Sequence, residues 1–355
     1  MVDPFYSGEI PEDKVEILFV TRNNEVVNYI STLLATTNNI CIPILGNTGF
    51  GKSSMLNLIA VIGKTVGLKV FKVRVDELAD EKNKKRIEDT DILLIDDVDK
   101  LNDSTVLSSY SQIEEYVKAG KRVFFSDTIQ RKIKIVKERD RITTGKAIIL
   151  PDLTSESPLD IFVIWVRMRM KKCRYKYVAE FSEDAIGLAV KRSKGNIRNF
   201  YRYCGMAYKY AYEYFCYKKK RDCYKEKGQE NMEKITIPLM ERAILAVDAN
   251  IISSLDELSK LILKVLCEKE RTNASELLTL IKEKGSNVSQ RTVYKKLEEL
   301  IECGLVVKTR VGHESLYSTI YHEIGMDVDP KTLDKIQDDY IYREPIDYRE
   351  DPLML

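Results

Sequence analysis

Residues 46–53 read Gly-Asn-Thr-Gly-Phe-Gly-Lys-Ser and follow the short apolar run of residues 40–45. Their spacing fits the pattern G-x-x-x-x-G-K-[ST], in which glycines let the backbone turn so that successive N–H groups point at phosphate. Lys52 can reach the outer phosphates of a triphosphate, and the Ser53 hydroxyl can bind Mg²⁺. The stretch that follows has a helical pattern, and the positive N-terminal end of a helix favours an anion. Strand, loop and helix together predict a site for ATP and Mg²⁺ formed by Gly46, Asn47, Thr48, Gly49, Phe50, Gly51, Lys52, Ser53 and Ser54.

A second motif lies further along the chain, where four consecutive apolar residues, 92–95, precede Asp96 and Asp97. This pattern is typical of a parallel strand that is buried on both faces and ends in carboxylates. Ligands of doubly wound sheets bind at that carboxyl edge. Asp96 is therefore predicted to hold Mg²⁺ together with Ser53, and Asp97 to orient or deprotonate the attacking water. Two acids after a strand could instead cap a loop, but the phosphate-binding loop upstream favours the catalytic interpretation.

The composition predicts a cytoplasmic protein of several domains. The chain has 355 residues, which is too many for one ordinary core, and it is 44% hydrophobic and 32% charged. It contains no apolar run long enough to span a bilayer, and residues 1–12 are polar and acidic, unlike a signal peptide. Seven cysteines are scattered without a CxxC pair beside only two histidines, so we expect reduced thiols rather than a zinc site.

Four segments in order resemble a known family: residues 46–53, Leu-Leu-Ile-Asp-Asp-Val at 93–98, Gly-Lys-Arg-Val-Phe-Phe-Ser-Asp at 120–127, and Asp-Arg-Ile-Thr-Thr-Gly at 140–145. From about residue 21 to residue 208 the chain resembles the AAA+ core of the bacterial initiator DnaA and its helicase-loader relatives. The resemblance implies a three-layer α/β domain with a helical lid, an ATPase activity and ATP-dependent assembly on DNA. Most AAA+ proteins have Glu as the second acid. Because Asp97 is one methylene shorter, we expect slow hydrolysis.

The resemblance also implies roles for residues outside the phosphate-binding loop. Asp127, with Ser126, ends a predicted strand at the position where this class carries a sensor that holds the hydrolytic water. Arg141 corresponds to the arginine finger, which reaches the γ-phosphate of a neighbouring subunit and is worth roughly 10³ to 10⁵ in rate. Arg139 is the second candidate for this role, and a plain solvated side chain is the alternative for Arg141. The segment Ser-Lys-Gly-Asn-Ile-Arg at 193–198 resembles the second sensor of AAA+ lids, so Arg198 is predicted to touch the γ-phosphate.

Residues 160–228 form a basic segment with 18 Lys and Arg against 7 Asp and Glu. Two helical patterns, one over residues 159–170 and one that opens with Ser182 as its N-cap, predict helices of the lid. From Tyr201 onward, tyrosines alternate with cations. Such a pattern suits stacking on single-stranded nucleic acid, contact with phosphates, or packing of the tyrosines inside the lid, and the sequence leaves these three open.

The last folded unit, residues 251–320, has three amphipathic helical patterns followed by two short strands around Gly312. Ser289 caps the third helix and Gly304 ends it. Three helices and a hairpin predict a winged helix-turn-helix, which resembles the C-terminal domain of archaeal and eukaryotic origin-recognition initiators. The unit is nearly neutral, with 11 basic and 10 acidic residues from 253 to 318, so a protein-contacting winged helix is the alternative. The third helix would enter the major groove by its N-terminal end, with these side chains facing DNA: Gln290, Arg291, Thr292, Lys295 and Lys296. The hairpin would meet phosphate or the minor groove through Lys308, Arg310 and His313.

These features predict a replication initiator or helicase loader that binds double-stranded DNA and self-associates through ATP, with a replicative helicase as a candidate partner. An ATP-switched winged-helix transcription regulator and a transposition-helper ATPase similar to IstB stay open. Residues 327–355 carry 9 acidic and 4 basic residues, so we expect an extended tail. The predicted domains are an AAA+ nucleotide-binding α/β domain at 1–155, a basic helical lid with a linker at 156–250, the winged helix at 251–322 and the acidic tail at 323–355.

Overall fold

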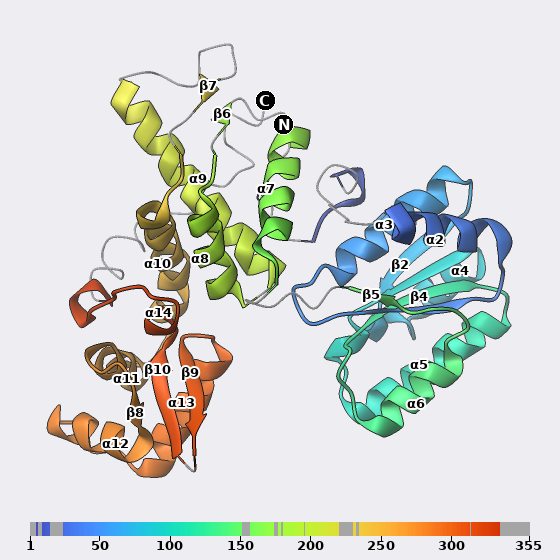
Figure 1. Cartoon of the computed structure of the whole chain (residues 1–355). Helices are drawn as coiled ribbons and strands as arrows, with labels where there is room; N and C mark the ends of the chain where they lie inside the picture. The colour runs from blue at the N-terminus through green and yellow to red at the C-terminus, as the bar shows by residue number, and fades with distance from the viewer. Residues whose placement is uncertain are drawn as a thin grey trace. The chain divides into compact units, whose positions relative to one another are not determined.

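The computed structural model describes residues 5, 9–14, 24–150, 157–173, 177–178, 180–194, 196–219, 230–231, 234–312 and 314–333. The chain forms two compact units. Residues 2–175 and 195–201 make up the α/β unit, and residues 176–194 and 202–355 make up the C-terminal unit (Figure 1). Over the described ranges, no helix combines the length and apolar character needed to cross a membrane.

A parallel five-stranded sheet forms the centre of the α/β unit. The strand order is β2-β3-β4-β1-β5, so β1, which leads into the phosphate-binding loop, lies between β4 and β5. Because all five strands run in the same direction, their carboxyl ends meet at one edge of the sheet. The strands span Cys41–Leu45 (β1), Val70–Arg74 (β2), Ile92–Asp96 (β3), Arg122–Asp127 (β4) and Ile148–Ile149 (β5).

Helices cover both faces of this sheet and give three layers (Figure 1). Every position of β3 is buried, as expected for a strand covered on both sides. On one face, Leu93 and Ile95 pack with α5 in a continuous core. On the other face α3 approaches so closely that a Cβ on Gly63 would lie 2.5 Å from Ile92 Cδ1. The helices around the sheet are α2 (Asn24–Thr36), α3 (Lys52–Thr65), α4 (Glu81–Glu88), α5 (Asp103–Lys118) and α6 (Ile133–Ile142), with 3₁₀ turns η1 (Glu12–Lys14), η2 (Val75–Glu77) and η3 (Val98–Lys100). The next helix, α7 (Leu159–Cys173), does not cover the sheet and packs through Phe162 against Phe200 near the start of α9 (Ile197–Lys219) (Figure 1).

The C-terminal unit contains helices of the lid followed by a winged helix-turn-helix. In the winged helix, a three-stranded antiparallel sheet of order β8-β10-β9 accompanies three helices. The lid elements are β6 (Tyr177–Val178), α8 (Glu183–Ser193), α9 (Ile197–Lys219, which begins in the α/β unit), β7 (Glu230–Asn231) and α10 (Ile237–Ser253). The winged helix comprises α11 (Glu257–Glu268), β8 (Thr272–Asn273), α12 (Ala274–Glu283), α13 (Gln290–Glu302), β9 (Val306–Val311), β10 (Glu314–Thr319) and α14 (Ile320–Glu323).

A buried polar cluster joins the lid helices to the winged helix inside the C-terminal unit. Asp248 on α10 has no exposed surface. It accepts hydrogen bonds from Arg192 Nε at 2.8 Å, from the Tyr321 hydroxyl at 3.0 Å and from the Tyr203 hydroxyl at 3.3 Å. Arg192 also donates to the backbone oxygen of Gly304 at 3.2 Å. Because a buried charge left without its partner is costly, this cluster fixes α8, α9 and α10 to the elements around α14.

The predicted fold class is confirmed: the chain has a three-layer α/β domain, a helical lid and a winged helix. Ser182 and Ser289 cap their helices as expected, since each hydroxyl accepts from the backbone N–H three residues on. The sequence interpretation missed α4, which lies in the charged run between β2 and β3. In the lid, several tyrosines are buried and pack in the core, namely Tyr201, Tyr203, Tyr208, Tyr210 and Tyr212. The acidic tail after residue 333 lies outside the described residues.

Candidate nucleotide-binding site

The phosphate-binding loop connects β1 to α3 at the carboxyl edge of the sheet. Gly46 follows β1 directly, and its N–H donates to the backbone oxygen of Asp127 on β4 at 3.2 Å. Gly49 and Gly51 have φ angles of 86° and 92°, a left-handed conformation that costs little only for glycine. Gly51 is the N-cap of α3, so the helix begins at Lys52. The loop backbone thus has the turn that the glycine spacing predicted.

Lys52 is folded back onto the loop. Its Nζ donates to the backbone oxygens of Gly46 at 2.9 Å and Asn47 at 3.1 Å. It also forms an ion pair with Asp99 Oδ2 at 3.1 Å, and only 8% of the Lys52 side chain is exposed. The sequence interpretation did not include Asp99, although the spacing Asp-Asp-Val-Asp at 96–99 offers a third acid at the same edge. The Lys52 ammonium therefore contacts the loop backbone and Asp99, and a bound phosphate could replace these partners.

Asp96 and Ser53, the two residues predicted to hold Mg²⁺, are brought together. Asp96 is 5% exposed and accepts hydrogen bonds from the Ser126 hydroxyl at 2.7 Å and from the Asp97 N–H at 2.9 Å. Ser53 lies beside it, because Lys72 Nζ contacts both the Ser53 backbone oxygen at 3.4 Å and Asp96 Oδ2 at 3.2 Å. Burial on its own would raise the pKa of the Asp96 carboxyl. The Lys72 ammonium and these hydrogen bonds outweigh burial and hold the pKa below its ordinary value, so the carboxylate is ionised at neutral pH.

The donor set at this edge fits Mg²⁺ bound together with a phosphate ligand. Ser53 and Asp96 provide hard oxygen donors, and among the described residues no group of three or more His, Cys, Asp or Glu side chains could hold a metal alone. Mg²⁺ is usually held by one or two protein oxygens plus substrate phosphates and water. Such a site needs no larger set of protein ligands.

Asp97 adopts an unusual backbone conformation directly after β3. Its φ angle is 64°, and its N–H donates to the Ser126 hydroxyl at 2.9 Å as well as to Asp96. Its carboxylate lies 2.8 Å from Lys100 Nζ, and a quarter of the side chain is exposed. A non-glycine residue at positive φ stores strain that is frequent at functional sites. The predicted role of Asp97 in activating water would require it to leave Lys100.

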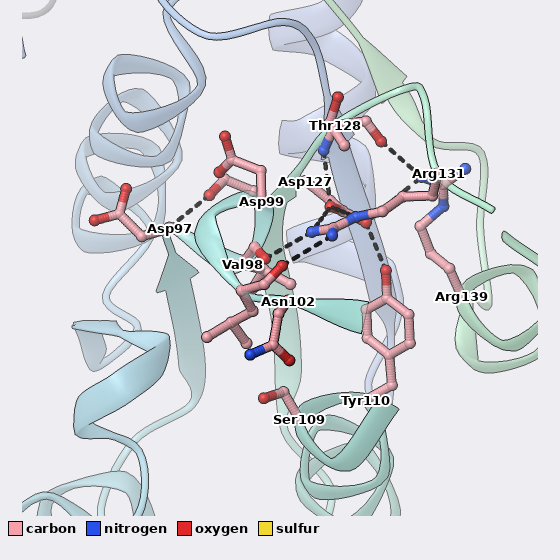
Figure 2. A network of polar contacts seen from close by, with 12 residues as sticks. Asp97, Val98, Asp99, Asn102, Ser109, Tyr110, Asp127, Thr128, Arg131 and Arg139 are labelled. Carbon is pink, nitrogen blue, oxygen red and sulfur yellow. Dashed lines mark hydrogen bonds and ion pairs between the residues drawn. The ribbon is translucent and has the colours of Figure 1, made fainter. Parts of the chain in front are cut away.

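Asp127 is enclosed in a network of protein donors (Figure 2). Its carboxylate has no exposed surface and accepts from the Tyr110 hydroxyl at 2.5 Å, the Thr128 N–H at 2.8 Å and Arg131 at 3.1 Å. Arg139 Nη1 lies 3.5 Å away. Asp127 cannot hold a water without breaking one of these contacts, so its sensor role stays a prediction. Ser126 is the residue of this pair that contacts Asp96.

Arg131 links this network to the loop after the two acids. Its guanidinium donates to the backbone oxygens of Val98 at 2.8 Å and Leu101 at 3.0 Å while it bonds Asp127 (Figure 2). Val98 begins η3, the turn that also carries Asp99. Arg139 lies on α6 and donates to the Thr128 backbone oxygen at 2.8 Å. Asp127 thereby ties the acidic loop to the helix that bears Arg141.

Arg141, the predicted arginine finger, lies near the end of α6 with 53% of its side chain exposed. It forms a two-pronged contact with Glu114, at 3.2 Å and 2.9 Å, and a further bond to Glu138 at 2.9 Å. The hydrogen bond from Arg141, with a second from Lys118, lowers the pKa of the Glu114 carboxyl to about 2. Arg141 is therefore at the surface but engaged within its own chain.

The second-sensor segment reaches the phosphate-binding loop through Asn196. Asn196 Nδ2 donates to the Thr48 backbone oxygen at 3.2 Å, while Oδ1 accepts from the Asn199 N–H at the start of α9. A Cβ on Gly49 would lie 2.5 Å from the Asn196 amide, so the loop glycine is needed for this approach. The sequence interpretation singled out Arg198, which lies exposed in the first turn of α9, and missed Asn196.

Two other residues assigned to the loop have structural partners. Phe50 is 8% exposed and belongs to the core. Ser54, on the first turn of α3, accepts the Ile10 N–H at 3.2 Å. Ser54 thus fixes the N-terminal segment of residues 9–14 against α3, a contact that the sequence did not predict.

The candidate DNA-facing side chains lie on α13 and β9 of the winged helix. Gln290, Arg291, Lys295 and Arg310 are exposed, and Thr292 is half-buried. Several of the cations have acidic neighbours in the same chain. Lys296 Nζ lies 2.5 Å from Asp256 and 2.6 Å from Glu299, Lys295 lies 3.8 Å from Glu299, and Lys308 lies 3.4 Å from Glu298. His313 lies outside the described residues.

A solved structure shares this fold over most of the chain. The Orc1 protein of Aeropyrum pernix, solved in complex with DNA, has a TM-score of 0.53 at 14% identity, over 95% of this chain and 94% of that chain. Weaker matches are a variant of RuvB from Thermotoga maritima (TM-score 0.45, 16% identity, 91% and 99% covered) and AMPPCP-bound DnaA from Aquifex aeolicus (TM-score 0.45, 14% identity, 83% and 92% covered). No family model and no curated protein sequence matches the chain. The chain has the AAA+ fold, and the predicted structural resemblance to AAA+ initiators is confirmed at the level of fold.

Proposed function

We propose that the chain is an ATP-dependent DNA-binding AAA+ protein that acts as a replication initiator or helicase loader and assembles on duplex DNA when it has bound ATP. The observation that carries the proposal is that Lys52, Ser53 and Asp96 gather at the carboxyl edge of the sheet. The same chain contains a winged helix-turn-helix, and the Orc1 protein with this fold was solved in complex with DNA.

Nucleotide binding would begin with an exchange of partners at Lys52. The ammonium would leave the loop carbonyls and Asp99 for the outer phosphates, while the backbone N–H groups of the loop donate to the same anion. Ser53 and Asp96 would hold Mg²⁺, which neutralises charge on the β- and γ-phosphates. Asp97 would leave Lys100 to orient or deprotonate the attacking water. Its short side chain favours slow hydrolysis, so that the nucleotide acts mainly as a switch.

Self-association would use the residues that already lie at the surface of the α/β unit. Arg141 would exchange Glu114 for the γ-phosphate bound by a neighbouring copy, which supplies a cation in trans. Exposed ion pairs contribute little net free energy, so the exchange is inexpensive. Arg198 would contact the γ-phosphate from the first turn of α9 in the same copy.

DNA binding would combine base and phosphate contacts of the winged helix. Gln290 and Arg291, at the exposed N-terminal end of α13, suit the edges of bases in the major groove. Lys295 on α13 and Arg310 on β9 are exposed and suit phosphates. Lys296 and Lys308 would first have to leave Asp256 and Glu298.

Two substitutions at the nucleotide site test the proposal. Lys52→Ala is expected to abolish ATP-dependent assembly on duplex DNA, because the outer phosphates lose their cation. Asp97→Asn is expected to retain assembly and to slow hydrolysis, because it alters only the activation of water. Sedimentation velocity of the full chain with duplex DNA, with and without ATP, measures the assembly of each variant, and phosphate release measures hydrolysis. Lys82→Ala, an exposed lysine of α4, is the control. Equal assembly of the two site variants would contradict the proposal.

A further inference from the structure

Lys72 lies in the middle of β2, and its ammonium contacts the carboxylate that is predicted to hold Mg²⁺. Nζ lies 3.2 Å from Asp96 Oδ2, and 22% of the Lys72 side chain is exposed. The same ammonium donates to the backbone oxygen of Ser53 at 3.4 Å, to Asn57 Oδ1 at 3.0 Å and to the Glu9 carboxylate. A cation of the protein itself is therefore built into the candidate metal site.

The partners of Lys72 come from three other segments of the α/β unit. Asp96 ends β3, Ser53 and Asn57 lie on α3, and Glu9 belongs to the N-terminal segment. The Asn57 amide holds Glu9 in place, since it donates to Glu9 Oε1 at 2.9 Å and to the Ile10 backbone oxygen at 2.8 Å. The ammonium thus has two carboxylates within reach. The Asp96 side chain is 8% exposed and the Glu9 side chain is 47% exposed, so one carboxylate is inside the site and the other is at its rim.

We propose that Lys72 is the internal counter-ion of the magnesium site, which neutralises Asp96 when no metal is bound, so that the chain binds ATP with little dependence on Mg²⁺. This inference rests on the proposed nucleotide binding. It goes beyond that proposal because it sets the metal requirement of the site, which the phosphate-binding loop alone does not determine.

The electrostatics of a triphosphate beside a carboxylate give the reason. Lys72 contacts both Asp96 and the Ser53 backbone oxygen in the first turn of α3, so phosphates held by the loop would lie near this carboxylate. An unpaired carboxylate would repel them, and a metal ion would then be needed to cancel the repulsion. With Lys72 paired to Asp96, the repulsion is already cancelled. The metal can still enter, because Glu9 and Asn57 are alternative acceptors for the ammonium.

Equilibrium binding of a fluorescent ATP analogue to the full chain, in Mg²⁺ and in excess EDTA, tests the inference. Chelation is expected to weaken wild-type binding by less than about threefold, and binding to Lys72→Met by about tenfold or more, equivalent to about 1.4 kcal/mol. Lys72→Arg keeps the charge and should behave like the wild type. Lys69→Met removes an exposed lysine that pairs with Asp89 and serves as the matched control. A thermal melt of each variant checks that it is folded.

The outcomes separate this inference from the proposed function. If chelation weakens wild-type binding tenfold or more, or weakens Lys72→Met no more than the wild type, Lys72 is not the counter-ion while the proposed nucleotide binding stands. If the wild type binds the analogue in neither condition, the proposed function fails and this inference fails with it. The wild-type comparison does not depend on the folding of any variant.

Discussion

The cations of the α/β unit and those of the winged helix have different surroundings. Beside the carboxyl edge of the sheet, Arg131 and Arg139 are 8% and 6% exposed and share the buried Asp127. On the winged helix, Lys295 and Lys308 are 77% and 43% exposed and lie beside acids at the surface. Buried ions lose more on losing a partner than they gain on acquiring one, whereas surface pairs are screened by water and salt. The first set therefore fixes geometry, and the second can change partners.

The largest effect is expected when the buried network loses its anion. Asp127→Ala leaves two arginines largely buried without their carboxylate and should lower the free energy of unfolding by about 3 to 5 kcal/mol. Denaturation of the full chain by urea measures this change. Asp89→Ala removes an exposed carboxylate from its pair with Lys69 and should leave the unfolding curve unchanged. If the two substitutions lowered the free energy of unfolding equally, buried and exposed ion pairs would not differ in this protein as proposed.

Loss of the loop ammonium should affect nucleotide affinity more than stability. Lys52→Ala is expected to weaken ATP binding at least about tenfold, because a charge-assisted contact with phosphate is lost. Asp99→Asn keeps Lys52 but removes its competing carboxylate, so ATP should bind this variant as tightly as the wild type or more tightly. Titration calorimetry measures both. Weaker binding to Asp99→Asn than to the wild type would mean that Asp99 supports the site instead of competing with phosphate.

Substitutions of exposed cations of the winged helix should change DNA affinity without changing the fold. Arg310→Ala is expected to weaken binding to all duplex sequences alike and to reduce the slope of log affinity against log salt by about 1. Arg291→Ala, at the start of α13, should cost about 1 to 3 kcal/mol at the preferred base and relax sequence preference. Fluorescence anisotropy at several salt concentrations separates the two effects. If neither substitution changes DNA affinity, the result favours the alternative that the winged helix contacts protein.

The smallest effect concerns pH at the ion pair between Arg141 on α6 and Glu114 on α5. The hydrogen bond from Arg141, supported by Lys118, lowers the pKa of Glu114 to about 2. Because the folded-state pKa lies below the unfolded value of about 4.3, the pair with Arg141 is fully formed above that value and is lost as pH falls toward 2. Assembly should therefore show no step from this pair between about pH 5 and 8. A Glu114→Gln variant whose pH profile over this window differs in shape from the wild type would contradict the assignment.

Local patterns in the sequence predicted the regular elements near the site. The glycine spacing at 46–53, the apolar run before Asp96 and the serine caps at 182 and 289 each depend on residues within a few positions, so the sequence contains the whole signal. Fold class and winged helix followed from the order of such patterns. The positive φ of the loop glycines was also foreseeable from their spacing.

Ion pairs between segments that are distant in sequence could not be predicted from local patterns. Lys52 with Asp99, Lys72 with Asp96, and Arg192 with Asp248 are each charged residues whose partner is decided by strand order and helix packing. An isolated lysine in a strand reads as an exposed side chain unless the neighbouring strand is known. Asp127 is the clearest example. Its position in sequence suggested a water-holding sensor, while its contacts come from α5, α6 and the loop before α6.

We propose above that a bound triphosphate controls assembly on duplex DNA. Multi-angle light scattering of the full chain mixed with random-sequence duplex, with ATP and without nucleotide, tests it most directly. Complexes that contain several copies per duplex are expected only when ATP is present, and separate copies are expected when it is absent. The same mass distribution in both conditions, or no uptake of nucleotide, would contradict it.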